Sequence, residues 1–248
     1  MKIWQKVIFN KKNLNSLSPQ KNYKKWISLT KNRIKINYKK IKNNNFSEHV
    51  ISSPLILIAL LQFKSKKIRI LDIGSGDLKS YFSFLKYKKF FKKIFFHSIE
   101  LSKIIQMYNS FKFLSNNNKI SFIASDNIQK FKYDIVHMSD SLHYISDWKP
   151  YLKKIIKMSP GYIIINATRV GKIKTFASFQ NYYKTQVPTW FFNEKEILSL
   201  FKKKYILLYN EEFINKILGN FTKLPMKNFP KKTRIENSKT FVFVKKCR

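Results

Sequence analysis

Two hydrophobic patterns follow one another along this chain, and together they predict its elements. Apolar side chains at helical spacing, with lysines on the opposite face, predict an amphipathic helix over residues 23–41. A second, more apolar helix is expected from Pro54, which suits a first helical turn, to about Phe63. Residues 1–20 are polar and interrupted by Pro19, so they predict irregular structure.

After residue 65, short and continuous apolar runs alternate with segments of helical spacing. The runs predict strands at residues 68–73, 93–100, 119–125, 133–139, 161–167, 204–209 and 240–246. Helices are expected at residues 77–91, 101–114, 148–158 and 193–203. Asn193 is the expected N-cap of the last helix, with Glu196 at capping-box spacing. Residues 168–192 predict a long aromatic connection, and residues 211–238 predict a loop.

Strands that alternate with helices predict a sheet with helices on both faces. The expected fold class is therefore α/β: a doubly wound, Rossmann-like and mostly parallel sheet of seven strands. The expected organisation is an N-terminal helical extension over residues 1–50 and a main domain over residues 51–248, with residues 168–192 as an aromatic insert. A length of 248 residues is enough for both parts.

The chain carries 50 Lys and Arg residues against 13 Asp and Glu, a formal net charge of +37. Such a charge attracts nucleic acids and anionic surfaces. However, only five of the basic residues are arginine, and the lysines are spread along the whole chain. Lys, Asn, Ile, Phe and Tyr share A/T-rich codons, so codon bias explains the composition better than a dedicated nucleic-acid surface does. Peripheral contact with anionic lipid stays open.

Cysteine content and the lengths of apolar runs limit the environment of the protein. The single cysteine, Cys247, excludes an intramolecular disulfide and a cysteine metal cluster, and no metal site is expected. The longest apolar run, residues 50–63, is shorter than the roughly 20 residues of a membrane-spanning helix. The N-terminus lacks the apolar stretch of a signal peptide, so a cytoplasmic protein is expected.

Two of the five glycines lie together where the first predicted strand meets its helix, in the sequence LDIGSGD of residues 71–77. Gly74 and Gly76 permit a tight turn and the close approach of a ligand to the backbone. In doubly wound sheets, ligands bind beyond the carboxyl ends of the strands. The turn is therefore a candidate ligand site, although a purely structural turn has the same signature.

Acidic residues stand at the ends of three successive predicted strands. Asp72 lies at the end of the first strand, Glu100 ends the second, and Asp126 follows the third. A carboxylate at Glu100 can accept hydrogen bonds from both hydroxyls of a ribose, and Asp126 can reach an adenine amino group. Because the chain has only 13 acids, their placement at three neighbouring strand ends favours a nucleoside site.

The residues around the turn narrow the choice of nucleoside. The sixth position of a dinucleotide-binding G-x-G-x-x-G is Lys79 here, and no phosphate-binding G-x-x-x-x-G-K-[ST] is present. Asp72 lies two residues before the first glycine, where a carboxylate suits a cationic amino group better than a phosphate. An adenosine with a cationic amino-acid tail is S-adenosylmethionine, which is the expected cofactor.

These motifs resemble those of class I S-adenosylmethionine-dependent methyltransferases. The matching segments are ILDIGSG (70–76), IEL (99–101), ASDN (124–127) and YDIVHMSDSLHYISDW (133–148). The third glycine of the first motif is replaced by Leu78. The chain also resembles a narrower family of methyltransferases found among genes for surface-polysaccharide biosynthesis, through NYKKWISLTKN (22–32) and TFASFQNYYKTQVPTWFFN (175–193).

The resemblance implies an enzyme with an antiparallel last strand and S-adenosyl-L-methionine as its cofactor. The residues implied in cofactor binding are Gly74, Ser75 and Gly76 for the methionine tail, Asp72 for its amino group, Glu100 for the ribose and Asp126 for the adenine, with Asn127 and Ser139 beside them.

Methyl transfer to an oxygen or nitrogen atom mainly requires alignment of donor and acceptor, and in some cases a base. The segment after the fourth strand supplies His143 as the first candidate base and Asp140 as the second. The aromatic insert supplies Gln180, Tyr182 and Trp190 as candidate acceptor-binding residues, or it forms a hydrophobic cover without a ligand.

Three functions are compatible with these residues. The first is methyl transfer to a small-molecule or glycan acceptor. The second is methylation of RNA through the basic surface, although SDSL (139–142) lacks the Asn/Asp-Pro-Pro-aromatic turn of base-amino methyltransferases. The third is a non-catalytic or NAD-binding module, against which Lys79 and the intact set of acids argue.

Overall fold

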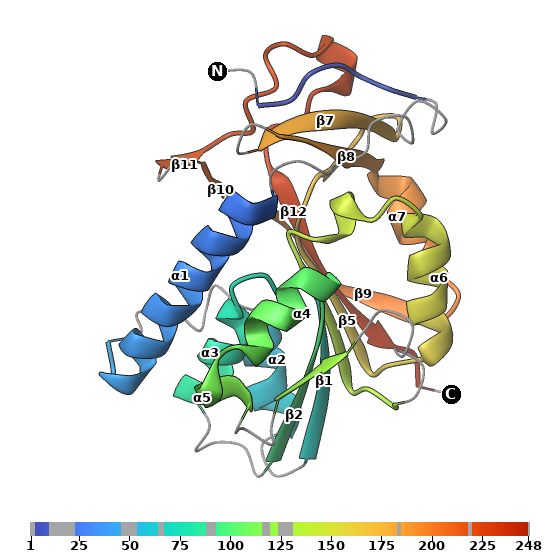
Figure 1. Ribbon diagram of the computed structural model, residues 1–248. Helices are drawn as coiled ribbons and strands as arrows, with labels where there is room; N and C mark the ends of the chain where they lie inside the picture. Colours follow the sequence, from blue (N-terminus) through green and yellow to red (C-terminus); the bar gives the residue numbers. More distant parts are fainter. Residues whose placement is uncertain are drawn as a thin grey trace. The chain divides into compact units, whose positions relative to one another are not determined.

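The chain forms two compact units in a computed structural model (Figure 1). We call residues 24–138 with 158–164 the glycine-loop unit, and residues 1–23, 139–157 and 165–248 the hairpin unit. The residues that the structure describes are 3–9, 23–45, 54–63, 67–87, 93–115, 120–123, 131–182, 185–217 and 220–247.

A seven-stranded sheet has the hydrogen-bonded order β3-β2-β1-β4-β5-β12-β9. Its strands are β1 (Lys67–Ile73), β2 (Lys93–Ile99), β3 (Ile120–Ile123), β4 (Ile135–Ser139), β5 (Tyr162–Thr168), β9 (Tyr205–Phe213) and β12 (Ser238–Lys245). Strand β1 pairs in parallel with β2 and β4, and the last strand, β12, pairs antiparallel with β9. The doubly wound, mostly parallel sheet with an antiparallel last strand is thereby confirmed.

The glycine-loop unit has its core on β1, β2 and β4, whose central residues are buried. Strands buried on both faces read as continuous apolar runs, which is why the sequence identified them. The helices of this unit are α1 (Tyr23–Lys42), α2 (Pro54–Phe63), α3 (Lys79–Lys86), α4 (Ser102–Asn109) and α5 (Lys112–Ser115).

Two of these helices differ from the expected ones at identifiable residues. Helix α3 begins only at Lys79, because Leu78 has a left-handed backbone with φ of 58°. The expected helix over 101–114 is interrupted at Ser110, whose hydroxyl donates a 2.7 Å hydrogen bond to the Met107 carbonyl. A serine that satisfies a carbonyl in this way competes with the helical ladder.

Helix α1 is amphipathic, as its spacing predicted. Ile34 is fully buried, and the Tyr38 ring stacks on Phe113 with 3.8 Å between ring centroids. Ile36 lies on the other side of the helix and is exposed. Tertiary packing of one face therefore stabilises a helix that carries no acid in its first turn.

The hairpin unit contains a three-stranded sheet of order β6-β8-β7, where the sequence predicted only an aromatic connection. Its strands are β6 (Val170–Gly171), β7 (Phe176–Tyr182) and β8 (Thr185–Asn193). The expectation of an aromatic connection without strands was wrong because buried polar residues, Ser178 and Thr189, interrupt the apolar runs of this hairpin. Phe176 and Phe179 lie on opposite faces of β7 and are both buried, so no alternation of apolar and polar residues marks the strand.

The N-terminal residues extend this sheet instead of remaining irregular. Trp4 forms an antiparallel bridge with Gln180, and Ile8 forms one with Ala177. The Ile8 and Ala177 amides each donate a 2.8 Å hydrogen bond to the other's carbonyl. Residues 10–22 lie outside the described part of the chain.

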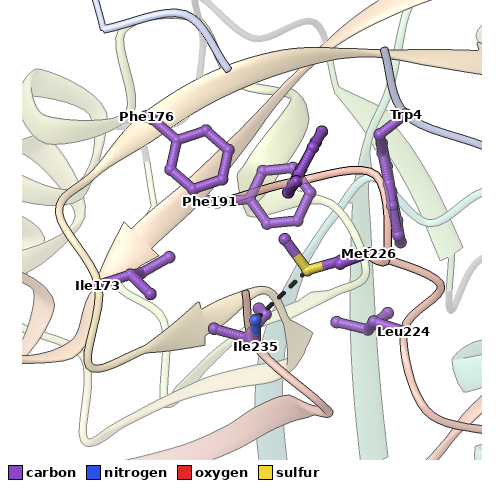
Figure 2. Packing of buried hydrophobic residues seen from close by; sticks show 8 residues of the cluster. Trp4, Ile173, Phe176, Phe191, Leu224, Met226 and Ile235 are labelled. Carbon is purple, nitrogen blue, oxygen red and sulfur yellow. Dashed lines mark hydrogen bonds between the residues drawn. The ribbon is translucent and has the colours of Figure 1, made fainter. Parts of the chain in front are cut away.

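A hydrophobic cluster ties the N-terminal residues to the rest of the hairpin unit (Figure 2). The Trp4 indole meets the Phe191 ring edge-on at 5.4 Å, and Phe191 stacks on Phe176 at 4.8 Å. The buried members are Trp4, Ile173, Phe176, Phe191, Leu224, Met226, Phe229 and Ile235. Aromatic contacts of this kind contribute beyond their buried area.

Among the remaining elements of the hairpin unit, the helix over residues 148–158 has its predicted bounds, whereas residues 211–238 depart from the predicted loop. They are η5 (Leu142–Tyr144), α6 (Trp148–Met158), α7 (Glu194–Phe201), β10 (Asn215–Ile217), β11 (Asn220–Thr222) and η6 (Lys231–Thr233). The Asn193 side chain caps α7 by accepting a 3.0 Å hydrogen bond from the Glu196 amide. The predicted loop over 211–238 was wrong in part, because β9 runs on to Phe213 and an antiparallel pair, β10 and β11, follows it.

None of the helices in the described residues combines the length and apolar character needed to cross a bilayer.

Candidate active site

The turn after β1 has the tight geometry that its glycines predicted. Gly74 and Gly76 have φ angles of 74° and 52°, in the left-handed region. The Gly74 amide donates a 2.9 Å hydrogen bond to the Ile99 carbonyl at the end of β2. The hydroxyls of Ser75 and Ser98 are 2.7 Å apart and hydrogen-bonded, so the turn is attached to both strands.

Leu78 occupies the place of the third glycine in this turn. Its φ of 58° is a left-handed conformation that costs an ordinary residue about 1 kcal/mol or more. Its side chain is fully buried. Burial of a leucine side chain is worth roughly 1.5–3 kcal/mol, which outweighs the strain and explains how a leucine is tolerated here.

Asp72 lies next to His137, a residue that the sequence did not single out. The two are direct cross-strand partners in the parallel register of β1 and β4. Asp72 Oδ1 is 2.7 Å from His137 Nδ1, and both side chains are buried. Asp72 Oδ2 is buried without a hydrogen-bond partner among the described residues. A buried carboxylate oxygen left unpaired is costly, so this atom is suited to a donor from a ligand.

Glu100 is held against the glycine turn rather than free in a loop. Its Oε1 accepts a 2.7 Å hydrogen bond from the Gly76 amide, and its Oε2 accepts a 3.1 Å bond from Leu101. Burial raises the pKa of Glu100, and the two backbone donors oppose that rise. The Tyr108 hydroxyl donates a 2.6 Å bond to the Gly76 carbonyl, which locks the turn from its other side.

Three of the sequence-predicted site residues are not placed in full. Asp126 and Asn127 lie outside the described residues, and so does the side chain of Tyr182. The backbone of Tyr182 pairs with Thr185 at the tip of the hairpin.

In the hairpin unit, Asp140 and His143 lie beside each other at the end of β4 and in η5. His143 Nε2 is 3.2 Å from Asp140 Oδ1. The His143 ring is fully buried, whereas 65% of the Asp140 side chain is exposed. Burial, aided by the charge of Arg169, lowers the pKa of His143 to about 4, so the ring is neutral at pH 7.

Two non-glycine residues with left-handed backbone lie near the ends of the neighbouring strands β4 and β5. Asp140 has a φ of 50° and Ala167, near the end of β5, has a φ of 52°. The Asp140 amide donates a 3.0 Å hydrogen bond to the Asn166 carbonyl, and the Asn166 side chain donates a 3.2 Å bond to the Ser139 hydroxyl. Strained non-glycine residues of this kind cluster at functional sites.

The hairpin places its two described candidate residues on opposite faces. Gln180 pairs with Val187 and Trp190 pairs with Ala177, and alternation along the strands directs Gln180 and Trp190 to different sides. Trp190 packs against the small cluster of Ile8, Ala177 and Phe179. Gln180 instead accepts hydrogen bonds from Tyr144 and Arg169.

Sequence reasoning missed His137, Arg169 and Tyr144. His137 had a weak signal, because it is a titratable residue inside an otherwise apolar strand. Arg169 and Tyr144 had none, since strand pairing brings them together from segments that are far apart in sequence. The described residues include no group of three His, Cys, Asp or Glu side chains that could hold a metal.

Comparisons with known proteins bear on the fold alone. No protein-family model and no curated protein matches the sequence. A chain of the complex between the Haloferax volcanii Trm112 methyltransferase activator and a candidate methyltransferase is similar to this chain, with a TM-score of 0.55 and 11% identity over 93% of this chain and 99% of that one. The PH0226 protein of Pyrococcus horikoshii has a TM-score of 0.52 and 14% identity over 83% of this chain and 93% of that one. The chain thus has the Rossmann-like α/β fold of methyltransferases.

Proposed function

We propose that the protein is an S-adenosylmethionine-dependent methyltransferase. The observation that carries the proposal is the buried Oδ2 of Asp72, two residues before Gly74, which has no hydrogen-bond partner among the described residues. A cationic amino group is the kind of donor that this oxygen lacks. The methyltransferase fold of the solved structures supports the same conclusion.

The residues of the glycine-loop unit fit this cofactor. Asp72 would hold the amino group of the methionine tail, and backbone groups of the turn from Gly74 to Gly76 would lie along that tail. Glu100 would accept hydrogen bonds from the ribose, because each of its oxygens has a lone pair beyond those used by Gly76 and Leu101. Asp126 and Asn127 are proposed for the adenine, whereas Ser139 belongs to the hairpin unit and stays a prediction of the sequence alone.

When bound, S-adenosylmethionine supplies a methyl group that is already activated on a sulfonium. The chain itself has to position the acceptor and take up its proton where the acceptor is a hydroxyl or an amine. We assign that proton to the exposed carboxylate of Asp140 rather than to His143, whose ring is fully buried. His143 then limits where Asp140 lies, because its neutral ring packs with Nε2 3.2 Å from Oδ1, although the two are not aligned as a hydrogen bond.

The proposed acceptor is a small molecule or a glycan. Hydroxyl, amide and carboxylate groups near the end of β4 and on β7, those of Asp140, Tyr144 and Gln180, suit an acceptor with several hydroxyls. The resemblance to methyltransferases encoded among polysaccharide genes points the same way. A partner subunit of the Trm112 type is compatible with the fold, since one similar structure is a complex with that activator.

Calorimetric titration with S-adenosylhomocysteine, 5′-methylthioadenosine and NAD tests the proposal. The first two ligands differ by the amino-acid tail, so Asp72→Asn should weaken only S-adenosylhomocysteine. Glu100→Gln should weaken both, since both contain the ribose. We expect at least a tenfold loss in each case, as for a charge-assisted hydrogen bond.

The exposed Glu211 on β9 provides a matched control, because Glu211→Gln removes one carboxylate without touching the turn. Glu211→Gln should bind S-adenosylhomocysteine with the affinity of the wild type, and NAD should bind to none of the proteins. If S-adenosylhomocysteine does not bind at ligand concentrations well above the micromolar range, the proposal is overturned. If Asp72→Asn and Glu100→Gln bind S-adenosylhomocysteine as tightly as Glu211→Gln does, the assignment of Asp72 and Glu100 to the cofactor is overturned.

A further inference from the structure

Arg169 is a buried cation in the hairpin unit, and only 5% of its surface is exposed. Within the described part of the chain, no carboxylate lies within ion-pair distance of its guanidinium. A buried charge without a partner costs several kcal/mol, which an apolar residue of the same volume would avoid. Asp140 is close enough for the guanidinium to help lower the pKa of its carboxyl, but the two form no ion pair, so Arg169 still lacks a direct counter-charge.

The hydrogen bonds of Arg169 all go to neutral oxygens. Nη1 donates to the Thr189 hydroxyl. Nη2 donates to Gln180 Oε1 at 3.0 Å and to the Tyr144 hydroxyl at 3.3 Å. A guanidinium has five N–H donors, so these three bonds leave two donors, the Nε–H among them, with no acceptor among the described residues.

Aromatic rings surround the same guanidinium. Its central carbon lies 5.2 Å from the ring centroid of Trp4, 5.5 Å from that of Tyr144 and 5.7 Å from that of Phe191 (Figure 2 shows Trp4 and Phe191). The rings exclude water and fix the plane of the guanidinium, so an anion that reaches it meets a preorganised and weakly screened charge.

The Arg169 cluster, which comprises Arg169, Tyr144, Gln180 and Thr189, reaches solvent on one side. Tyr144 is 39% exposed, and its 2.8 Å hydrogen bond to Gln180 is at the surface. Tyr144 is the last residue of the 3-10 turn η5, and Asp140 lies two residues before that turn. A molecule bound at Arg169 therefore extends naturally towards the proposed proton-accepting carboxylate.

We propose that the Arg169 cluster binds an anionic group, a carboxylate or a phosphate ester, of the molecule that is methylated. The assignment of that molecule as the methyl acceptor rests on the proposed function, whereas the anion site itself does not. The acceptor class narrows accordingly from neutral small molecules and glycans to acidic ones.

The scarcity of arginine makes the site directly observable. The chain contains only five arginines, so its 15N-Nε spectrum should hold five resonances, and the Arg169→Lys variant assigns one of them. The titrants are benzoate, glucuronate and glucose 1-phosphate, with benzamide and glucose as their neutral counterparts, all at constant ionic strength. The carboxylates and the phosphate ester distinguish the two anion sources.

We expect a saturable shift of the Arg169 Nε resonance with an anionic titrant and none with its neutral counterpart. Arg169→Met should weaken the binding of that titrant, followed by calorimetry, at least tenfold. Lys153→Met removes one exposed positive charge from α6 of the same unit and should leave the affinity unchanged. Arg169→Met removes the desolvation cost of a buried charge that has no ion-pair partner among the described residues, so the variant should fold.

Weak, non-saturating shifts of all five resonances would show only general attraction to a chain of charge +37, and would overturn the proposal. An unshifted Arg169 resonance would overturn it too, as would equal affinities of Arg169→Met and Lys153→Met. The result is independent of cofactor binding. If the anion binds and S-adenosylhomocysteine does not, the proposed methyltransferase is refuted and the anion site at Arg169 stands. If S-adenosylhomocysteine binds and the anion does not, only the anion site is refuted.

Discussion

At the scale of single residues, two buried histidines influence how stability depends on pH. Both rings are neutral at a pH at which a free histidine begins to protonate. His143 is fully buried, and His97 is buried with its Nδ1 3.1 Å from the Tyr133 hydroxyl. Burial, together with a nearby arginine in each case, lowers the pKa of each to about 4. Neither ring can therefore titrate near pH 6.5 in the folded protein.

Acidification should consequently destabilise the protein through His143. Between pH 6.5 and 4 the unfolded chain binds a proton at this residue and the folded chain does not. The contribution of His143 to stability is complete above about pH 6.5, and about 2 kcal/mol of it is lost by pH 5. Urea unfolding at pH 7.5 and pH 5.0 measures how far the free energy of unfolding falls between the two pH values. The fall should be smaller by about 2 kcal/mol in His143→Gln than in the wild type.

His97→Gln provides a second variant from the glycine-loop unit, and its effect should add to that of His143→Gln because the two rings share no partner. Parallel pH dependences in the wild type and in His143→Gln would contradict the assignment of a neutral buried ring.

At the scale of elements, two helix ends carry the same strain with different burial. Leu78 precedes α3 with a φ of 58°, and Ser159 follows α6 with a φ of 56°. Leu78 is fully buried, whereas Ser159 is partly exposed before Pro160, as in a left-handed helix C-cap.

Glycine should therefore have opposite effects at these two positions. Ser159→Gly relieves the strain and should stabilise the protein by about 0.5–1 kcal/mol. Leu78→Gly relieves a similar strain but loses a buried side chain, so a net destabilisation of about 2–3 kcal/mol is expected. Chemical unfolding of both variants measures the difference, and a stabilised Leu78→Gly would contradict the argument.

The N-terminal strand should depend on Trp4 for its attachment. Trp4→Ala removes the indole that packs on Phe191, and the bridge between Ile8 and Ala177 should then open more often. Hydrogen exchange of the Ile8 and Ala177 amides should accelerate at least tenfold, while amides of β12 keep their rates. Unchanged exchange at Ile8 would show that the bridge holds without the indole.

At the scale of the whole molecule, the charge of +37 predicts binding to polyanions that carries no information about the reaction. A short single-stranded RNA should bind at about 50 mM salt and lose most of its affinity at about 200 mM, because its binding releases counterions. Bound RNA should accept no methyl group from tritiated S-adenosylmethionine. Filter binding and tritium incorporation measure the two separately, and methylated RNA would favour the RNA methyltransferase over the acidic acceptor.

The fold was largely predictable because its determinants are local. Continuous apolar runs and helical spacing located β1, β2, β4, α2 and α6, and alternation alone predicted the class of sheet. The hairpin of β7 and β8 could not be predicted, because buried polar residues such as Ser178 and Thr189 break its apolar runs, and burial on both faces removes any alternation.

The candidate site divides in the same way. Gly74, Gly76 and Asp72 were identifiable because a turn that needs left-handed backbone and an acid at a strand end are visible in a short segment. The pairing of Asp72 with His137 was not, because it depends on the register of two strands that are 65 residues apart.

The sequence by itself determined the order of strands and helices in the seven-stranded sheet, the glycine turn, and Asp72 and Glu100 at the strand ends, since each depends on neighbouring residues. Only the tertiary structure decided that Asp140 is exposed while His143 is buried, and that Arg169 stands among three aromatic rings with no described acid at ion-pair distance. Burial and charge pairing are properties of segments brought together from distant parts of the chain, and no local pattern encodes them.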